Sequence, residues 1–289
     1  MKLIEHLEKE IQKTGYPVEM EISTVLDEGN WLVDWNNYYY DADMNVAREL
    51  DIRATPYKPE KDKQKEEIFS FYPFLAIECK KSESNAWVFF KRKMKLGTFG
   101  FEGQYLDYIT AWNIQEWFSP IYATLLGNLH YYKSREFSRA YKQIKLQKDR
   151  ASSKDEIFEA INQLVKYLSY EIENYVDLYK GGKMKIMSNI FYFPIIVFDG
   201  KLYEAVLNDG QLGLKKVNHT TFLTFYRPRH APGRLPFLMD VVQRNHFPKF
   251  LRLIEKEIEL ISKKIETYEG IQQEFVTSLR KIGREKSKD

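Results

Sequence analysis

The sequence predicts an α/β protein with a mixed central sheet, and three patterns support this prediction. Around Asp51, apolar residues alternate with polar ones, which is typical of a strand with one buried face. The nearly unbroken apolar run over 190–198 is typical of a strand buried on both faces. Over 153–179, apolar residues recur every three or four positions, which predicts a long helix with one face against the core.

A helix and two strands are expected at the start of the core. Pro17 suits the first turn of a helix and Gly29 suits its end, so one helix is expected between them. Residues 31–40 then form a strand, and 41–45 form the turn that returns the chain antiparallel. The acidic residues of this turn also resemble the start of a calcium-binding loop. Val46 stands where such a loop needs a glycine, so we interpret 41–45 as a turn only.

Two carboxylates and a lysine are expected to converge on the next two strands. Asp51 points to one face of its strand, and in the apolar segment 74–81 Glu78 and Lys80 are two positions apart and share a face. Such oxygen ligands suit magnesium or manganese, which can acidify a water and neutralise charge on a phosphate. Lys80 could orient or deprotonate that water. The pattern favours a metal-dependent nuclease, although a strand that simply emerges into solvent also fits it.

This arrangement resembles the PD-(D/E)xK nuclease superfamily, which has a restriction-endonuclease-like core of helix, three strands, helix and strand. The superfamily motif is an Asp at the end of the second strand and Glu-x-Lys on the third, matched here by Asp51 and Glu78-Cys79-Lys80. Leu50 replaces the proline of the motif, which is often absent in the superfamily. The resemblance implies catalytic roles for Asp51, Glu78 and Lys80. It also implies that Asp51, Glu78 and the backbone carbonyl of Cys79 bind Mg²⁺, for which Mn²⁺ can substitute.

The resemblance extends to both helices of the core. Many members carry a catalytic Glu on the first helix, for which Glu19 is the first choice here and Glu21 the reserve. On the long helix, Gln163 and Tyr167 are similar to the Gln-x-x-x-Tyr motif of the recombination-nuclease branch, whose side chains approach the substrate. One helical turn separates these two residues, so they share a face. A solvated carboxylate and a chance match are the alternative interpretations, and Lys166 is a further candidate for a phosphate contact.

Further strands are expected after the long helix. Asp199-Gly200 predicts a hairpin turn that pairs 190–198 with a strand over 201–207. Asn208-Asp209-Gly210 predicts a second turn, and 221–226 an additional strand at the edge of the sheet.

A helical insertion is expected at about 91–150. Two helical patterns, roughly 102–118 and 120–147, contain many aromatic residues. They form either an insertion with an aromatic core or a cap whose aromatic rings stack on unpaired bases. The basic residues at its start, which suit either a phosphate backbone or a solvated charged face, are Lys91, Arg92 and Lys93.

Composition limits the class of protein. The chain has 289 residues, 44% hydrophobic and 29% charged, which suits one substantial core, expected over 1–248. A net charge of only +3 means that affinity for nucleic acid must come from local basic patches. No segment resembles a signal peptide or a membrane span, so we expect a cytoplasmic protein with no membrane partner. The single cysteine excludes an internal disulfide, and the five scattered histidines show no zinc-ligand spacing.

The end of the chain predicts a coiled-coil-like helix over 249–289. From Leu251 onward, apolar residues alternate in steps of three and four. Such a helix either pairs with a second copy or lies along another part of the same chain, and we favour a homodimer through 249–284.

Together these patterns predict a magnesium-dependent nuclease. Its expected partner is nucleic acid, with DNA preferred and RNA left open. The alternative is a non-catalytic nucleic-acid-binding or scaffold protein that keeps the fold and dimerises through its C-terminal helix.

Overall fold

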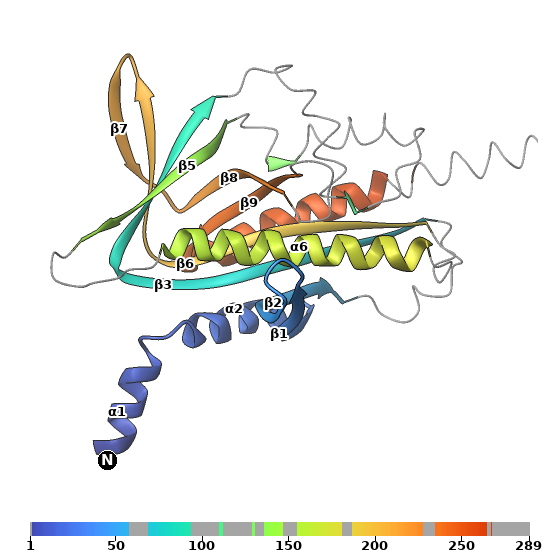
Figure 1. Cartoon of the computed structure of the whole chain (residues 1–289), viewed down its shortest axis with the longest axis horizontal. Coiled ribbons are helices and arrows are strands. Elements are labelled where there is room, and N and C mark those ends of the chain that lie inside the picture. Colours follow the sequence, from blue (N-terminus) through green and yellow to red (C-terminus); the bar gives the residue numbers. More distant parts are fainter. Residues whose placement is uncertain are drawn as a thin grey trace, which may run out of the picture.

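The computed structural model describes residues 2–57, 69–93, 110–111, 129–130, 136–146, 155–180, 187–227, 235–264 and 267. The strands in this part of the chain join in one mixed sheet with helices against both of its faces (Figure 1). The predicted α/β class with a mixed central sheet is therefore confirmed. Among the described residues, no helix is both long and apolar enough to cross a membrane.

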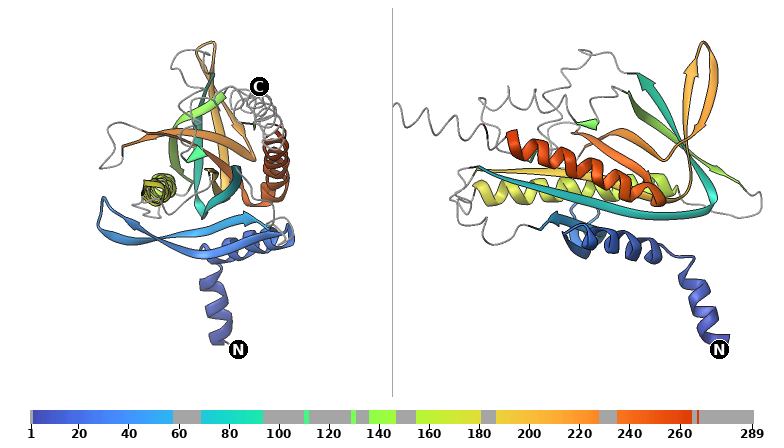
Figure 2. Two further views of the ribbon diagram at one scale, coloured as in Figure 1. Left: turned by 90° about the vertical axis from the view of Figure 1, so that its right-hand side faces the viewer. Right: turned by 180° about the vertical axis from the view of Figure 1, so that it is seen from behind.

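The helices and strands follow one another along the chain with these bounds. They are α1 (Lys2–Ile11), α2 (Tyr16–Glu28), β1 (Trp31–Asp41), β2 (Val46–Pro56), β3 (Phe69–Lys93), β4 (Thr110–Ala111), β5 (Glu136–Lys145), α6 (Glu156–Lys180), β6 (Met187–Asn208), β7 (Gln211–Lys216), β8 (His219–Tyr226), β9 (Leu235–Gln243) and the short 3₁₀ helix η3 (Arg244–His246). A helix over 247–264 follows and is called the C-terminal helix below. α1 extends away from the rest of the described chain (Figures 1 and 2).

The sheet is built around two long parallel strands. β1, β2 and β3 form an antiparallel meander, and β6 pairs with β3 in parallel along most of its length. α2, β1, β2, β3, α6 and β6 therefore occur in the order helix, three strands, helix, strand, with β4 and β5 between β3 and α6. The second half of β3 also pairs with β5.

Some of the strands form a closed ring of pairings. β5 contacts β8 through Ser138 and Phe222, β8 pairs with β9, and β9 pairs with β6. Since β3 pairs with both β5 and β6, it closes the ring, which runs through β3, β5, β8, β9 and β6. β1 and β2 extend the sheet from the first half of β3, outside this ring.

Apolar clusters cover the two faces of the sheet. One lies beneath α2 and the C-terminal helix, and the other lies beneath α6. Ile195 and Ile196, which are consecutive on β6, belong to different clusters because side chains alternate along a strand. The left view of Figure 2 shows α6 and the C-terminal helix on opposite sides of the sheet.

Residues 136–145, expected within a helix, form the strand β5 instead. Phe137 and Tyr141 are four positions apart, a spacing that suits a helix, but β5 pairs with residues 85–93 of β3. This pairing with a distant segment supplies hydrogen bonds that local spacing does not reveal. The prediction of a helical insertion at about 91–150 is therefore wrong for residues 91–93, which end β3, and for residues 136–145, which form β5. The expected helix over 102–118 lies outside the described residues except for β4.

The expected hairpin at Asp199-Gly200 is also wrong, because β6 continues through both residues. A side chain at Gly200 would place its Cβ 2.3 Å from Phe198, whose ring stacks on Trp87 with centroids 3.9 Å apart. Gly200 is needed here for close packing within a strand and not for a turn. The second turn is confirmed, since Asp209 and Gly210 have positive φ and join β6 to β7. The additional strand is also present, as β8.

The C-terminal helix packs on its own chain. Leu251, Ile254 and Ile261 are buried in the cluster beneath it, and Trp31 Nε1 donates a hydrogen bond to Glu255 at 3.1 Å. The expected self-association through 249–284 therefore does not hold for this part of the apolar seam, which is already covered. Residues 268–289 lie outside the described part of the chain. β9, which precedes the helix, has no counterpart among the expected strands.

Candidate functional site

The point where β2 and β3 separate positions Asp51. Their ladder pairs Ile52 with Ile77, Arg53 with Ala76 and Ala54 with Leu75, and it ends there. The next main-chain N–H on β3 that needs an acceptor belongs to Cys79, and the Asp51 carboxylate accepts its hydrogen bond at 2.7 Å. The end of the ladder therefore brings a β2 carboxylate against the Glu78-Cys79-Lys80 segment.

Glu78 is a fully buried carboxylate beside Asp51. Its Oε2 atom accepts a hydrogen bond from Lys80 Nζ at 2.7 Å, whereas Oε1 has no hydrogen-bond partner among the described residues. Burial raises the pKa of Glu78 to about 8, and the charge of Asp51 adds to this effect while Lys80 opposes it. A buried carboxylate oxygen without a partner is costly, which points to a ligand at this position.

Lys80 lies between the two carboxylates. Its Nζ atom is 2.7 Å from Glu78 and 3.9 Å from Asp51. Burial alone would lower the pKa of Lys80, but the two carboxylates outweigh it and raise this pKa above its usual value. Lys80 is therefore cationic at neutral pH, which suits orientation of a water and charge neutralisation better than proton abstraction.

Glu19 approaches the same place from α2. A Cβ atom at Gly15 would lie 3.1 Å from Glu19 Oε1 and 3.7 Å from the carbonyl oxygen of Cys79, so both oxygens border the space above this glycine. Burial raises the pKa of Glu19 to about 7, with a further contribution from the charge of Asp51. A raised pKa is expected for a carboxylate that is partly buried and has another acid beside it.

Glu21, the reserve choice on α2, points elsewhere. It accepts a hydrogen bond from Arg244 Nε at 2.8 Å, and Arg244 also pairs with Asp199 at 2.9 Å. The structure therefore favours Glu19 as the helix carboxylate.

The donor set at this place fits a hard divalent cation. Glu19, Asp51 and Glu78 supply carboxylate oxygens and Cys79 a main-chain carbonyl, which are the oxygen ligands that Mg²⁺ and Mn²⁺ prefer. The unpartnered Glu78 Oε1 and the space at Gly15 support this assignment. These carboxylates are not gathered tightly around one point, since Lys80 stands between Asp51 and Glu78. The Glu78 side chain also leaves β3 on the face opposite α2, from which Glu19 approaches.

Gln163 and Tyr167, the two α6 residues expected to contact substrate, make contacts within the protein. Tyr167 is fully buried and meets Tyr39 edge to face, with ring centroids 5.6 Å apart. A direct contact of Tyr167 with a substrate does not agree with this placement. The main-chain carbonyl of Gln163 accepts a hydrogen bond from the Tyr39 hydroxyl at 3.2 Å. Lys166, the further phosphate candidate, pairs with Asp41 at 2.6 Å.

The basic residues at the end of β3 are remote from the site along the strand. Lys91 pairs with Glu204 at 3.3 Å and with Glu136 at 3.5 Å. A strand rises about 3.3 Å per residue, so Lys91 lies on the order of 35 Å from Lys80 along the path of β3. Arg92 is exposed and Lys93 ends the strand. Lys91 and Arg92 therefore do not join Asp51 and Glu78, and a role in substrate binding would require a substrate that extends over this distance.

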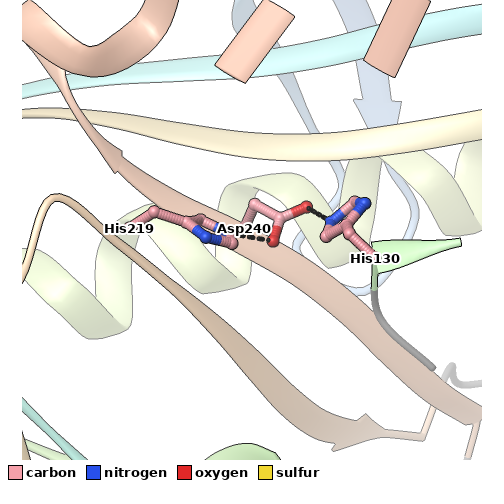
Figure 3. A group of neighbouring side chains, drawn as sticks. All are labelled: His130, His219 and Asp240. Atoms are coloured by element: carbon pink, nitrogen blue, oxygen red, sulfur yellow. Dashed lines mark hydrogen bonds and ion pairs between the residues drawn. The ribbon is translucent and has the colours of Figure 1, made fainter. Parts of the chain in front are cut away.

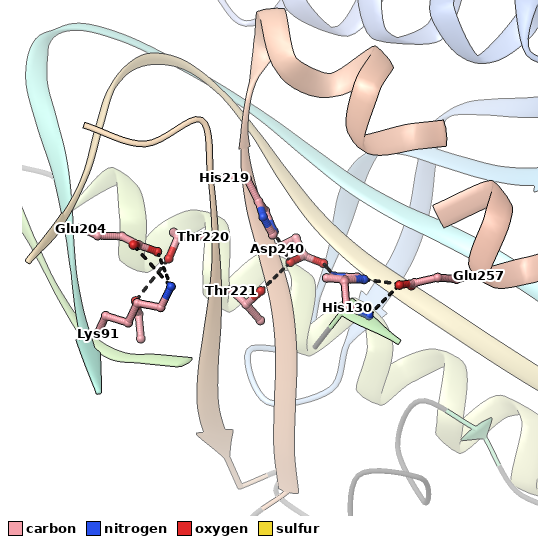
Figure 4. Close-up of polar contacts among 9 residues, drawn as sticks. Lys91, His130, Glu204, His219, Thr220, Thr221, Asp240 and Glu257 are labelled. Atoms are coloured by element: carbon pink, nitrogen blue, oxygen red, sulfur yellow. Dashed lines mark hydrogen bonds and ion pairs between the residues drawn. The ribbon is translucent and has the colours of Figure 1, made fainter. Parts of the chain in front are cut away.

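A polar cluster not expected from the sequence lies on β8, β9 and the C-terminal helix (Figures 3 and 4). Asp240 is fully buried and lies between His130 Nε2 at 3.1 Å and His219 Nε2 at 2.6 Å. Thr221 donates to Asp240 at 2.9 Å, and Glu257 lies 2.8 Å from His130 Nδ1. These residues are far apart in the sequence, so their spacing does not indicate that they form a cluster. The buried Asp within the apolar β9 segment was the available signal.

Electrostatic coupling in this cluster is strong. Burial alone would lower the pKa of His130, but Asp240 and Glu257 outweigh it and raise the pKa to about 10. Burial alone would raise the pKa of Asp240, but the imidazoles of His130 and His219 outweigh it and hold the pKa below its usual range.

Comparison of the chain with protein-family models, with curated proteins and with solved structures finds no match. The functional assignment therefore depends on the geometry of the site and on the order of its elements.

Proposed function

We propose that this protein is a metal-dependent nuclease with a restriction-endonuclease-like core, acting on DNA. One observation carries the proposal: Asp51, Glu78, the carbonyl of Cys79 and Lys80 meet where β2 and β3 separate, with Glu19 reaching them from α2. Their supporting elements follow the order helix, three strands, helix, strand. This combination is what the resemblance to the PD-(D/E)xK superfamily implies.

The chain supplies the ligands for one divalent cation. Asp51, Glu78 and the Cys79 carbonyl would hold Mg²⁺ or Mn²⁺, and Glu19 would add an accessory carboxylate. When bound, the cation would lower the pKa of a coordinated water and supply a positive charge that stabilises the transition state of phosphodiester hydrolysis. The raised pKa values of Glu19 and Glu78 follow mainly from burial, with a smaller contribution from the charge of Asp51, and a bound cation would offset both effects.

Lys80 has the role of a fixed positive charge. Its hydrogen bond to Glu78 holds the ammonium at the edge of the carboxylate cluster. From there it would orient the attacking water and offset charge on the phosphate oxygens. Tyr39, hydrogen-bonded to α6 through Gln163, is buried close enough to Glu78 and Lys80 for their charges to affect its pKa.

The test is cleavage of labelled single-stranded, duplex and branched DNA, with RNA in parallel, in Mg²⁺, in Mn²⁺ and in chelator. We expect metal-dependent products, a loss of at least about 100-fold in Asp51→Asn and Lys80→Ala, and a smaller loss in Glu19→Gln. Glu21→Gln is the matched control on α2 and should cleave normally, because Glu21 faces Arg244.

Two outcomes would overturn the proposal. One is cleavage that persists in chelator or is equal in folded Asp51→Asn and in the unaltered chain. The other is binding of nucleic acid without cleavage in every metal, which would favour the scaffold alternative. Products from RNA alone would keep the chemistry and change the substrate from DNA to RNA.

A further inference from the structure

The cluster on β8, β9 and the C-terminal helix has the form of a metal site. His130, His219 and Asp240 each offer one ligand atom, and these atoms all lie within 4.8 Å of one another. Figure 3 shows both imidazoles pointing at the carboxylate of Asp240 from opposite sides. His219 begins β8, Asp240 lies within β9, and His130 belongs to a separate short segment.

A second group of contacts orients the candidate ligands. Glu257 Oε2 is 2.8 Å from His130 Nδ1, and its Oε1 atom accepts the main-chain N–H of His130 at 2.6 Å (Figure 4). Nδ1 is therefore engaged, and Nε2 is the atom aimed at Asp240. A metal-binding histidine usually donates its other ring N–H to a carboxylate in this way. Thr221 fixes Asp240 from β8.

The balance of charge also favours a divalent cation. Asp240 and Glu257 are both buried carboxylates, and only the two imidazoles of His130 and His219 face them within the cluster. A divalent ion bound to Nε2 of each histidine would neutralise both carboxylates. Each histidine would bind the ion as a neutral imidazole with its proton on Nδ1, and the proton that Nε2 shares with Asp240 would be displaced to solvent or to Nδ1.

We propose that His130, His219 and Asp240 form a binding site for a divalent transition-metal ion such as Zn²⁺, with Glu257 as a positioning residue for His130. Two imidazoles and one carboxylate suit Zn²⁺ or Co²⁺ better than Mg²⁺ or Ca²⁺, which prefer oxygen ligands alone. The side chain of His219 is 27% exposed, so solvent can complete the coordination on that side.

This site is separate from the carboxylates of the proposed nuclease site. Ile77 on β3 is in register with Ile195 on β6, which is in register with Asp240 on β9. The neighbours of Asp240 on its face of β9, Leu238 and Val242, belong to the cluster beneath the C-terminal helix. Ile77 belongs to the same cluster, so Glu78, the next residue on β3, points to the opposite face.

The bound ion would act as a clamp. It would fasten the segment at 129–130 to β8 and β9, and Glu257 would connect the same point to the C-terminal helix. These are segments distant in sequence, so an ion that binds only the folded arrangement stabilises it by mass action.

The test is Co²⁺ and Zn²⁺ binding to the full chain after dialysis against chelator. We expect one equivalent of Co²⁺ to give visible absorption bands of low-symmetry, histidine-coordinated cobalt. Zn²⁺ should abolish these bands, millimolar Mg²⁺ should not, and Zn²⁺ should raise the melting temperature. His219→Ala should lose the bands, and Glu257→Gln should weaken Co²⁺ binding by about 10-fold to 100-fold.

Two control variants show whether the bound cobalt belongs to this cluster. His6→Ala removes an exposed histidine on α1 and should leave Co²⁺ binding unchanged. Asp51→Asn should also keep the cobalt bands, so the outcome is independent of the proposed nuclease. No visible bands in the unaltered chain, or equal bands in folded His219→Ala, would overturn the proposal, leaving the cluster a buried ion-pair network.

Discussion

The carboxylate of Asp51 on β2 accepts the main-chain N–H of Cys79 on β3, one step beyond the last rung of the ladder between these strands. The Asp51 side chain thus takes the place of the main-chain carbonyl of β2 that would accept this hydrogen bond if the ladder continued. The geometry leaves the carbonyl of Cys79 free of β2, on the side where Glu19 lies. Local separation of the two strands opens the place that the proposed cation would occupy.

Gly15→Ala tests the space between Glu19 and Cys79. The added Cβ would lie 3.1 Å from Glu19 Oε1, so the carboxylate must move. We expect the Mg²⁺ concentration for half-maximal cleavage to rise about tenfold, as for other changes next to metal ligands. Gly15 has φ −73°, so alanine causes no backbone strain, and the free energy of unfolding should change by less than about 1 kcal/mol. An unchanged Mg²⁺ midpoint would place Glu19 outside the metal site.

Asp41→Asn tests a buried ion pair at the start of the turn after β1. Lys166 and Arg48 both contact the Asp41 carboxylate, whose side chain is 1% exposed. Burial alone would raise the pKa of Asp41, but these two cations outweigh it and lower the pKa. The pairing therefore contributes stability above the unfolded pKa of about 3.9, and the contribution is lost as pH falls through the lower folded pKa.

We expect Asp41→Asn to lower the free energy of unfolding by on the order of 3 kcal/mol at pH 7, because Lys166 loses a buried partner. The difference from the unaltered chain should shrink in acid, where Asp41 itself is protonated. Urea unfolding at pH 7 and near pH 3 measures both values. An equal difference at the two pH values would show that the charge of Asp41 is not what stabilises the turn.

Gly200→Ala tests the close packing inside β6. The Cβ atom would meet the Phe198 ring at 2.3 Å, and that ring is held by Trp87. We expect a loss of about 1–3 kcal/mol from overpacking, measured by thermal or urea unfolding. Gly213→Ala on β7 is the matched control. Its Cβ would approach only Val206 O at 3.7 Å, and its effect should stay within about 0.5 kcal/mol.

Ile254→Ala tests whether the C-terminal helix is held by its own chain. Ile254 is fully buried in the cluster beneath that helix, so the variant should lose about 2–5 kcal/mol. Leu260→Ala, at a residue 43% exposed on the same helix, should change stability by less than about 0.5 kcal/mol. The melting temperature of both should not depend on protein concentration. A strong concentration dependence would instead indicate that a second copy covers the helix.

The neighbourhood of Asp51, Glu78 and Lys80 could be predicted because it depends on local rules. Alternation along a strand fixes which residues share a face, and Glu78 and Lys80 are only two positions apart. The packing of Cys79 away from them follows from the same rule, and its side chain is buried beneath α2. The sequence narrows the helix carboxylate to two candidates, Glu19 and Glu21. The contact of Glu21 with Arg244, which only the structure reveals, decides in favour of Glu19.

Other features depend on contacts between distant segments, which a single sequence does not display. Phe137 and Tyr141 suit either a helix or a strand, and pairing with β3 decides for the strand. Local turn chemistry at Gly200 is overridden by the Phe198 ring and by pairing along β3. His130 and Asp240 meet through the packing of segments that are distant in sequence, so the acidic residue within the apolar β9 segment is the sign of their cluster that the sequence offers.

The closed ring of strands has a kinetic consequence. The chain that forms α6, β6 and β7 separates Ser138 on β5 from Phe222 on β8, so their contact closes a long loop unless those elements form first. Pairings between such distant segments carry a large loop-closure cost and slow the search for the native state. We therefore expect slow, cooperative refolding in which the ring closes late.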